Sequence, residues 1–393
     1  MKVLYTITSS SPATGGAQIH LHQIAQQLST HHTVNVAAFW NRNRTDWLLG
    51  TTVSADSPGH IVSVDGVPVH LLGWSAAQKA TFLPAVALYY FFMPQIVPHI
   101  ASLLLPQLEQ IHPKPDLVHN VRIGREPLTW ASMDFAHQKN IPFIFTPLHH
   151  PRWQGWRYRV YHQLYRQADA LISLTNVEKE YLVSTGVREE RVHVLGNGPT
   201  LAPQAHPEAF NQKFSLGSAP FVLFIGQHYS YKGYGQLLQS APLVWQKIPE
   251  THFVFIGPPV HNSENHFKQL PDPRIHRLGM VDLRTKTDAL AACSLLCVPS
   301  TQESFGGVYT EAWSFAKPVI GCPIPAVREV ISNTEDGILV DQHPGPIADA
   351  IISLLTHPGL SSRLGSHGQQ KVANHYSWPQ LAVKLEKIYQ SLL

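Results

Sequence analysis

The sequence is poor in charge and in cysteine, and each shortage excludes a class of protein. Only 14% of the 393 residues are charged and the formal net charge is +3, so we expect no basic surface for nucleic acid. The cysteines are too few for a disulfide framework. The cysteines are Cys293, Cys297 and Cys322, and all lie in apolar segments. This favours a reducing, cytoplasmic location.

Two chemical motifs are also missing. No Asp-x-Asp occurs in the chain, which argues against an acidic clamp for a divalent metal, and we expect neither a metal site nor a cofactor. No Gly-x-Gly-x-x-Gly occurs, which argues against a dehydrogenase that binds a dinucleotide. The first residues lack the long apolar region and cleavage site of a signal peptide, so Lys2–Thr8 is predicted to be a buried strand.

Charged residues are absent from one long stretch, Ala80 to Leu108. A membrane-spanning helix needs about 20 apolar residues in succession. Prolines interrupt every candidate here: Pro84, Pro94, Pro98 and Pro106. Two interpretations remain. The stretch is either a pair of helices buried in its domain, or an exposed aromatic face that rests on a membrane surface or a lipid acceptor.

What the sequence does contain is an alternation of short apolar strands and helical segments. The alternation occurs on both sides of a stretch with Pro, Gly and Ser, from Thr200 to Ala219. This predicts an α/β protein of two Rossmann-like domains, residues 1–200 and 201–376, followed by an amphipathic helix. Two sheets with facing carboxyl ends would form a cleft, and domain interfaces are favoured ligand sites.

The second predicted domain is organised around Ser300–Gly321. This stretch follows a predicted strand and contains a glycine-bearing loop, a helix and the next strand. Gly306 and Gly307 open this helix, whose first-turn amides favour an anion. Glu303 lies in the loop, and Glu311 lies about one turn inside the helix. Because carboxylates accept hydrogen bonds from sugar hydroxyls, the stretch fits a nucleotide sugar, although a solvated helix start would have the same pattern.

A lysine and a pair of glycines mark two further candidate sites. Lys232 is predicted at the start of a helix that follows the strand Phe221–Ile225, where a cation opposes the helix dipole unless an anion is bound nearby. Gly15 and Gly16 precede the first predicted helix, as in a turn that admits a phosphate, although a plain tight turn has the same residues.

Two histidines mark a third candidate. His149 and His150 follow the predicted strand Ile141–Thr146. Open α/β sheets bind their ligands beyond the carboxyl ends of the strands, so these imidazoles could hydrogen-bond a substrate or move a proton. The chain holds 24 histidines, so a structural role is also open.

Taken together, these motifs resemble the retaining glycosyltransferases of family 4, which have the two-domain GT-B fold. The most specific match is the pair of glutamates within Ser300–Gly321, and the resemblance covers nearly the whole chain. The final helix is similar to the family's C-terminal helix, which crosses back onto the first domain, so residues 377–393 are assigned to that role. Three glycine motifs also match: Gly15-Gly16, Gly196-Asn197-Gly198, and Gly226 with Lys232-Gly233.

The resemblance implies a nucleotide-diphosphate sugar donor, such as a UDP-sugar, held mainly by the second domain. In this arrangement Glu303 would hold sugar hydroxyls, Glu311 the ribose hydroxyls, and Lys232 would neutralise the departing diphosphate. One of His149 and His150 would lie in the active site, with His150 preferred. The implied donor-binding residues are Gly15, Gly16, Gly226, Gln227, Lys232, Glu303, Ser304, Phe305, Gly306, Gly307 and Glu311.

This chain departs from the family at two positions. Gln227 stands where the family usually has an arginine, and Leu148 stands where it usually has the active-site histidine. We predict metal-independent transfer of a sugar, with retention of configuration, to a glycan or lipid-linked acceptor, as in polysaccharide biosynthesis. Peripheral contact with the inner face of the cell membrane would suit such an acceptor. The Gln227 departure leaves a nucleotide-sugar-binding protein without transfer activity as the alternative.

Overall fold

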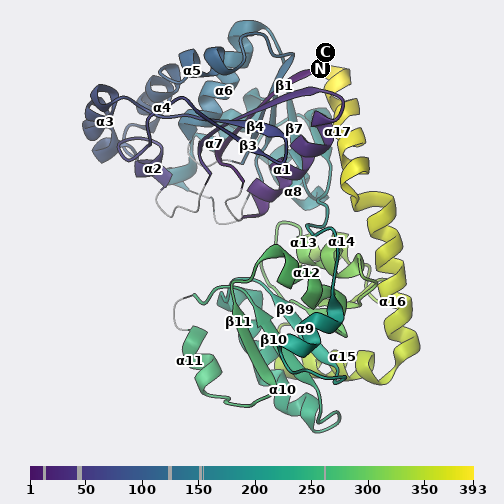
Figure 1. Ribbon diagram of the computed structural model, residues 1–393. Coiled ribbons are helices and arrows are strands. Elements are labelled where there is room, and N and C mark those ends of the chain that lie inside the picture. Colours follow the sequence, from purple (N-terminus) through teal and green to yellow (C-terminus); the bar gives the residue numbers. More distant parts are fainter. Residues whose placement is uncertain (12–14, 42–46, 123–125, 150–152, 154, 261–262) are drawn as a thin grey trace. The chain divides into compact units, whose positions relative to one another are not determined.

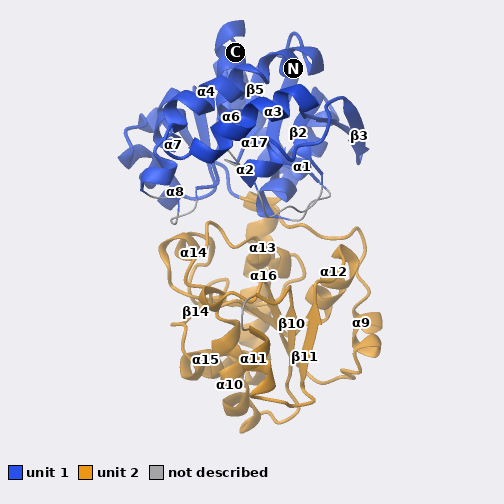
Figure 2. Ribbon diagram, turned by 90° about the vertical axis from the view of Figure 1, so that its left-hand side faces the viewer, with its two compact units in different colours: residues 1–196, 378–393 blue, residues 197–377 orange. Residues whose placement is uncertain are grey.

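The computed structural model describes residues 1–11, 15–41, 47–122, 126–149, 153, 155–260 and 263–393. The chain divides into two compact units, coloured separately in Figure 2. Unit 1 comprises Met1–Gly196 together with Trp378–Leu393, and unit 2 comprises Asn197–Ser377. The sequence analysis places these divisions at 200/201 and 376/377, four residues and one residue away.

Unit 1 is built on an eight-stranded sheet in the order β3-β4-β2-β1-β5-β6-β7-β8. Every pair of neighbours is parallel except the hairpin of β3 and β4. The strands are β1 (Lys2–Ser9), β2 (Thr33–Trp40), β3 (His60–Val64), β4 (Val67–Leu71), β5 (Leu117–Val121), β6 (Phe143–Thr146), β7 (Ala170–Ser173) and β8 (Val192–Val194).

Helices cover both faces of this sheet (Figure 1). Alternate residues of β1 explain why: Tyr5 packs into one apolar cluster and Leu4 into the other, because successive side chains of a strand point to opposite faces. The helices are α1 (Gly16–Ser29), α2 (Trp47–Gly50), α3 (Ala76–Leu88), α4 (Met93–Ser102), α5 (Leu105–Ile111), α6 (Glu126–Lys139), α7 (Tyr161–Gln167), α8 (Asn176–Ser184) and α17 (Trp378–Leu392), with 3₁₀ turns η1 (Trp156–Tyr158) and η2 (Glu189–Arg191).

Unit 2 has a six-stranded sheet in the order β11-β10-β9-β12-β13-β14, and all of its strand pairs are parallel. The strands are β9 (Phe221–Ile225), β10 (His252–Ile256), β11 (Ile275–Gly279), β12 (Leu295–Cys297), β13 (Val319–Gly321) and β14 (Ile338–Leu339). The helices are α9 (Pro207–Lys213), α10 (Tyr234–Trp245), α11 (Ser263–Lys268), α12 (Leu283–Ala292), α13 (Gly307–Trp313), α14 (Pro325–Val330), α15 (Pro344–Thr356) and α16 (Pro358–Lys371), with the 3₁₀ turn η3 (Ser230–Lys232) and the π-helical turn η4 (Val372–Tyr376).

The last helix, α17, belongs to unit 1, as the resemblance predicts. Its buried residues join the apolar cluster of β1 and α1. Near its end the Tyr389 hydroxyl lies 2.7 Å from that of Tyr5 and 2.5 Å from Nδ1 of His119. The apolar face and this polar network together hold the C-terminal helix on the first sheet.

The charge-free stretch from Ala80 to Leu108 is buried in part and exposed in part. It folds into α3, α4 and the first half of α5, and side chains such as Val97 and Leu104 are fully buried. Other side chains of the same stretch, among them Phe91, are exposed. Within the described residues, none of the helices combines the length and the apolar character that crossing a membrane requires.

Two local predictions were wrong. The sequence from residue 153 to residue 166 predicts one helix, but the structure divides it into η1 and α7, and Gly155 just before η1 has a φ of 85°. Lys232 does not begin α10. It closes the 3₁₀ turn η3, and Gly233 in the left-handed conformation stands between it and the helix.

Candidate functional site

The predicted site residues of unit 2 gather where its strand order reverses. Chain order runs outward from β9 to β10 and β11 on one side, and from β12 to β13 and β14 on the other. Because β9 and β12 are parallel neighbours, the loops that follow them leave the same edge of the sheet. In open α/β sheets such a reversal opens a crevice at the carboxyl ends of the strands, which is where ligands bind.

Backbone contacts fasten these two loops together. The N–H of Thr301 donates to the carbonyl of Tyr231 over 2.8 Å, and the side-chain amide of Gln342 donates to the carbonyls of Tyr231 and Pro299. Gly233, with a φ of 80°, lies so close to Pro299 that an added Cβ would be 2.5 Å from its carbonyl oxygen. Only glycine fits this position, both for its conformation and for the space.

Lys232 and Glu303 form an ion pair in this place. Nζ of Lys232 lies 2.5 Å from Oε1 of Glu303, and the two side chains are only 21% and 11% exposed. The sequence predicts that these residues act together although they are 71 positions apart, and the structure brings them into contact. A half-buried ammonium beside a carboxylate offers donors for a phosphate and acceptors for hydroxyls side by side.

Glu311 is paired with a lysine that the sequence analysis did not single out. Nζ of Lys286, on α12, lies 2.7 Å from Oε1 of Glu311, and both side chains are largely buried. Burial raises the pKa of Glu311, and Lys286 and the backbone of Thr200 oppose that rise. Oε2 of Glu311 is buried and has no hydrogen-bond partner within the described part of the chain, so it can accept one from a ligand hydroxyl.

The glycine-containing loop before α13 has a fixed shape. Gly306 is the N-cap of α13 in the left-handed conformation, with a φ of 85°, and a Cβ there would lie 2.5 Å from the ring of Tyr309. The Tyr309 hydroxyl donates to the carbonyl of Val298 over 2.7 Å. Phe305 is buried against Tyr376, whereas Ser304 and Gly307 are half-buried. Aromatic side chains therefore anchor this loop.

Gly226 and Gln227 follow β9 directly. The N–H of Gly226 donates to the carbonyl of Ile256, and Gly257 approaches so closely that a Cβ there would be 2.0 Å from the oxygen of Gly226. Gln227 is exposed and carries no charge. The positive charge that the family resemblance implies at this position is missing, and the next residue, His228, is buried among aromatic rings with its pKa lowered to about 4 by burial.

In unit 1 the structure describes only some of the predicted residues. Gly15 is the N-cap of α1, directly after residues 12–14, and Gly16 is the exposed first residue of that helix. His149 is 7% exposed, its imidazole stacks on the ring of Tyr181 at 3.9 Å, and its Nδ1 lies 3.0 Å from the Tyr165 hydroxyl. His150 lies outside the described residues, so its assignment stays a prediction.

A buried glutamate that the sequence analysis missed holds the loop after β6. Glu178 accepts backbone N–H groups from His149 over 2.7 Å and from Leu174 over 2.8 Å. Burial raises its pKa to about 7, and these two hydrogen bonds oppose the rise. They hold the backbone next to Leu148, whose φ of 50° is costly for a residue with a side chain. The sequence Thr175-x-x-Glu178 has the form of a capping box and could have revealed it.

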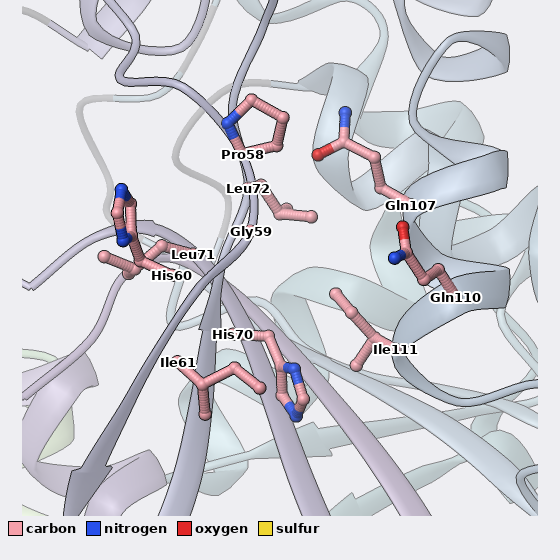
Figure 3. Close-up of a pocket in the computed structure, with 10 residues that line it drawn as sticks. All are labelled: Pro58, Gly59, His60, Ile61, His70, Leu71, Leu72, Gln107, Gln110 and Ile111. Carbon is pink, nitrogen blue, oxygen red and sulfur yellow. The ribbon is translucent and has the colours of Figure 1, made fainter.

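One cavity of about 370 Å³ lies in unit 1, between the β3–β4 hairpin and α5 (Figure 3). None of the predicted site residues lines it. Its polar side chains include His70, which lies 3.0 Å from Asn35, and Gln107, which is hydrogen-bonded to the backbone of Gly73. The hydrogen bonds of these two side chains are therefore made within unit 1. Across the described residues, no three His, Cys, Asp or Glu side chains are grouped to hold a metal ion.

Two family models match the chain in succession. Residues 15–198 match the Glycosyl transferase 4-like domain, and residues 219–357 match Glycosyl transferases group 1. The chain belongs to the GT4-type glycosyltransferases of the GT-B fold. In this glycosyltransferase the second match includes the Lys232–Glu303 and Lys286–Glu311 ion pairs, and the first match begins at Gly15.

Curated relatives resemble this glycosyltransferase over part of their length. It is 27% identical over 247 residues to a D-inositol 3-phosphate glycosyltransferase of Xylanimonas cellulosilytica, covering 58% of each chain. It is 28% identical over 194 residues to a phosphatidyl-myo-inositol mannosyltransferase of Mycobacterium leprae, covering 45% of this chain and 51% of the relative. The matches therefore span little more than half of these relatives.

Solved structures share the fold of this glycosyltransferase over its whole length. HepE of Anabaena, in complex with UDP and glucose, has a TM-score of 0.74 with 17% identity and full coverage of both chains. Sucrose-phosphate synthase of Thermosynechococcus elongatus has a TM-score of 0.76 with 18% identity, covering 99% of this chain and 98% of that one. These likenesses establish the GT-B fold.

Proposed function

We propose that this glycosyltransferase moves a sugar from a nucleotide-diphosphate donor, with UDP-sugars the first choice, to a glycan or lipid-linked acceptor. Configuration at the anomeric carbon is retained and no metal takes part. The observation that carries the proposal is the Lys232–Glu303 ion pair at the strand-order reversal of unit 2. HepE of Anabaena with UDP-glucose supports the donor, and the phosphatidyl-myo-inositol mannosyltransferase supports a lipid-linked acceptor.

Each half of the pair has a distinct role. The Lys232 ammonium has three donors, so it can keep Glu303 and still neutralise the diphosphate as negative charge develops on it. Glu303 accepts hydroxyl hydrogen bonds from the donor sugar. The free Oε2 of Glu311 accepts a hydrogen bond from a ribose hydroxyl, while backbone amides of residues 305–307 face the sugar and diphosphate.

In the reaction the bond between the anomeric carbon and the phosphate oxygen breaks, and a bond to the acceptor oxygen forms on the same face. The acceptor's proton passes to the departing phosphate oxygen. Lys232 stabilises this oxygen, and Glu303 positions the sugar without becoming a nucleophile. The roles predicted for His149, His150, Gly15 and Gly16 of unit 1 stay predictions.

The test is a panel of UDP- and GDP-sugars, first by thermal shift and then by release of nucleotide diphosphate. A bound donor should raise the melting temperature through linkage. The variants Lys232→Ala and Glu303→Ala should both lose turnover, while a surface variant such as Val383→Ala keeps it. Unimpaired turnover in both site variants would remove the assignment.

Gln227 is exposed and stands at the position where the family usually has an arginine. It therefore favours one competing function, a nucleotide-sugar-binding protein without transfer activity. The same panel separates the two. Donor binding with no diphosphate released, for any acceptor or for water, would establish binding alone. If Gln227 merely slows the reaction, Gln227→Arg should raise turnover.

A further inference from the structure

Unit 1 presents a group of exposed apolar side chains, here termed the aromatic surface. Its members come from α3, from the turn between α3 and α4, and from η1. They are exposed by 62% for Leu83, 47% for Leu88, 70% for Phe91, 50% for Phe92 and 50% for Trp156. The rings of Phe91 and Trp156 meet edge to face at 5.5 Å, so segments 65 positions apart in sequence form one surface. Grouped exposed side chains of this size mark an interaction site.

Arg159 forms hydrogen bonds to the backbone of the segments that carry this surface. The Arg159 guanidinium donates to the carbonyls of Tyr90 over 2.8 Å, Phe91 over 3.3 Å and Trp156 over 2.8 Å. It also lies over the Trp156 ring, 4.5 Å from its centroid. The backbone of this turn and the Trp156 ring are therefore held in place before any partner arrives, which lowers the conformational entropy lost on binding.

The two segments that supply the aromatic surface carry charge of one sign. No Asp or Glu occurs from Gly66 to Leu108 or from Phe135 to Ala168, the two segments that supply the surface. Exposed Arg157 lies next to it, over the ring of Tyr90 at 5.2 Å. A partner that matches this pattern combines an apolar interior with negative charge at its boundary.

We propose that the aromatic surface binds the anionic face of a lipid bilayer. Phenylalanine and leucine side chains enter the boundary between headgroups and acyl chains, tryptophan lies at headgroup level, and Arg157 contacts the negative headgroups. This extends the proposed function, because a bilayer site would bring a lipid-linked acceptor to unit 1. Its test needs neither donor nor acceptor, so the two proposals can fail separately.

The experiment is co-sedimentation of the full chain with vesicles of phosphatidylcholine, alone or mixed with phosphatidylglycerol. The wild type should bind the anionic vesicles, and less so at high salt. The triple variant Phe91→Ala/Phe92→Ala/Trp156→Ala should bind at least about tenfold more weakly. Arg157→Gln should weaken binding about fivefold, as expected for one basic residue near an anionic surface.

The matched control is Ile61→Ala/Val383→Ala, which removes two side chains of unit 1 that are 65% and 51% exposed but lie outside the aromatic surface. It should bind vesicles as the wild type does. The triple variant should keep the nucleotide-induced thermal shift, which shows that it is folded. Three results would overturn the proposal: no binding of the wild type to anionic vesicles, equal binding by the triple variant, or a dimer in sedimentation velocity that the triple variant abolishes.

Discussion

Glu303 and Glu311 of unit 2 are held differently from Glu178 of unit 1. In unit 2, Glu303 and Glu311 each have a lysine within 2.7 Å, supplied by the loop after β9 and by α12. In unit 1, Glu178 is held by two backbone amides, and burial raises its pKa to about 7. A carboxylate beside an ammonium can exchange that partner for a ligand, whereas one held by amides in an apolar setting serves to fix a loop.

This difference distinguishes the glutamates proposed to bind the donor from a glutamate that holds a loop in place. The paired glutamates of unit 2 lie beyond the ends of β12, where the strand order reverses. Glu178 of unit 1 lies in the first turn of α8 and holds the backbone of His149. The four predictions below either sharpen this contrast or break it, beginning with the largest effect.

Lys232→Met should lower kcat by about 10²- to 10³-fold, because the departing diphosphate loses the charge that stabilises it. Lys232→Arg keeps the charge and should retain far more activity. The measurement is steady-state release of nucleotide diphosphate with saturating donor. If Lys232→Met stays within threefold of the wild type, the pair with Glu303 is structural, and the contrast between the units disappears.

Glu178→Gln should remove a pH dependence of stability worth about 3 kcal/mol. The folded-state pKa of about 7 lies above the model value of 4.5. The folded protein therefore keeps a proton that the unfolded chain releases, and this contribution is complete below the lower pKa and lost as pH rises through the higher one. Urea unfolding followed by tryptophan fluorescence across this range measures it. Parallel pH profiles for variant and wild type would contradict the assignment.

Lys286→Met should lower the free energy of unfolding by about 2 kcal/mol, because it leaves the buried carboxylate of Glu311 without its cation. Adding Glu311→Gln to this variant should restore part of the loss, since the remaining side chain is then neutral. The readout is urea unfolding near neutral pH. An additive loss in the double variant would show that the two side chains are not coupled.

Tyr389→Phe should cost about 1 kcal/mol, since Nδ1 of His119 and the Tyr5 hydroxyl each lose a fully buried hydrogen-bond partner. Tyr5→Phe breaks only one of these bonds and should cost less. Thermal unfolding of the two variants, compared with the wild type, gives the order. An equal or reversed order would mean that the His119 contact contributes little to docking α17.

Much of the local structure was predictable from pattern alone. The bounds of β9 agree with the sequence analysis to the residue, because an apolar run between Pro220 and Gly226 defines this strand. The division of residues 153–166 was not predictable. Arg159 bonds there to the carbonyls of Tyr90 and Phe91, and such a long-range contact leaves no trace in local periodicity.

The candidate site shows the same limit. Glu303, Glu311 and Lys232 were found from glycine spacing and an unfavourable helix-start position, although Lys232 itself precedes the helix. Lys286 was not predicted, because nothing in the sequence around α12 shows that its ammonium reaches α13. Glu178 was not predicted either, because its contact with His149 spans 29 positions. Its capping-box spacing was nevertheless visible in the sequence.

By itself, the sequence determined the alternation of strand and helix, the glycines at positions such as 233 and 306, and the identity of the acidic and basic groups. Tertiary structure decided which lysine meets which glutamate and which carboxyl group keeps its proton. The reason is that pairing depends on which strands become neighbours in the sheet, and a pKa depends on burial. Both are set by residues far away along the chain.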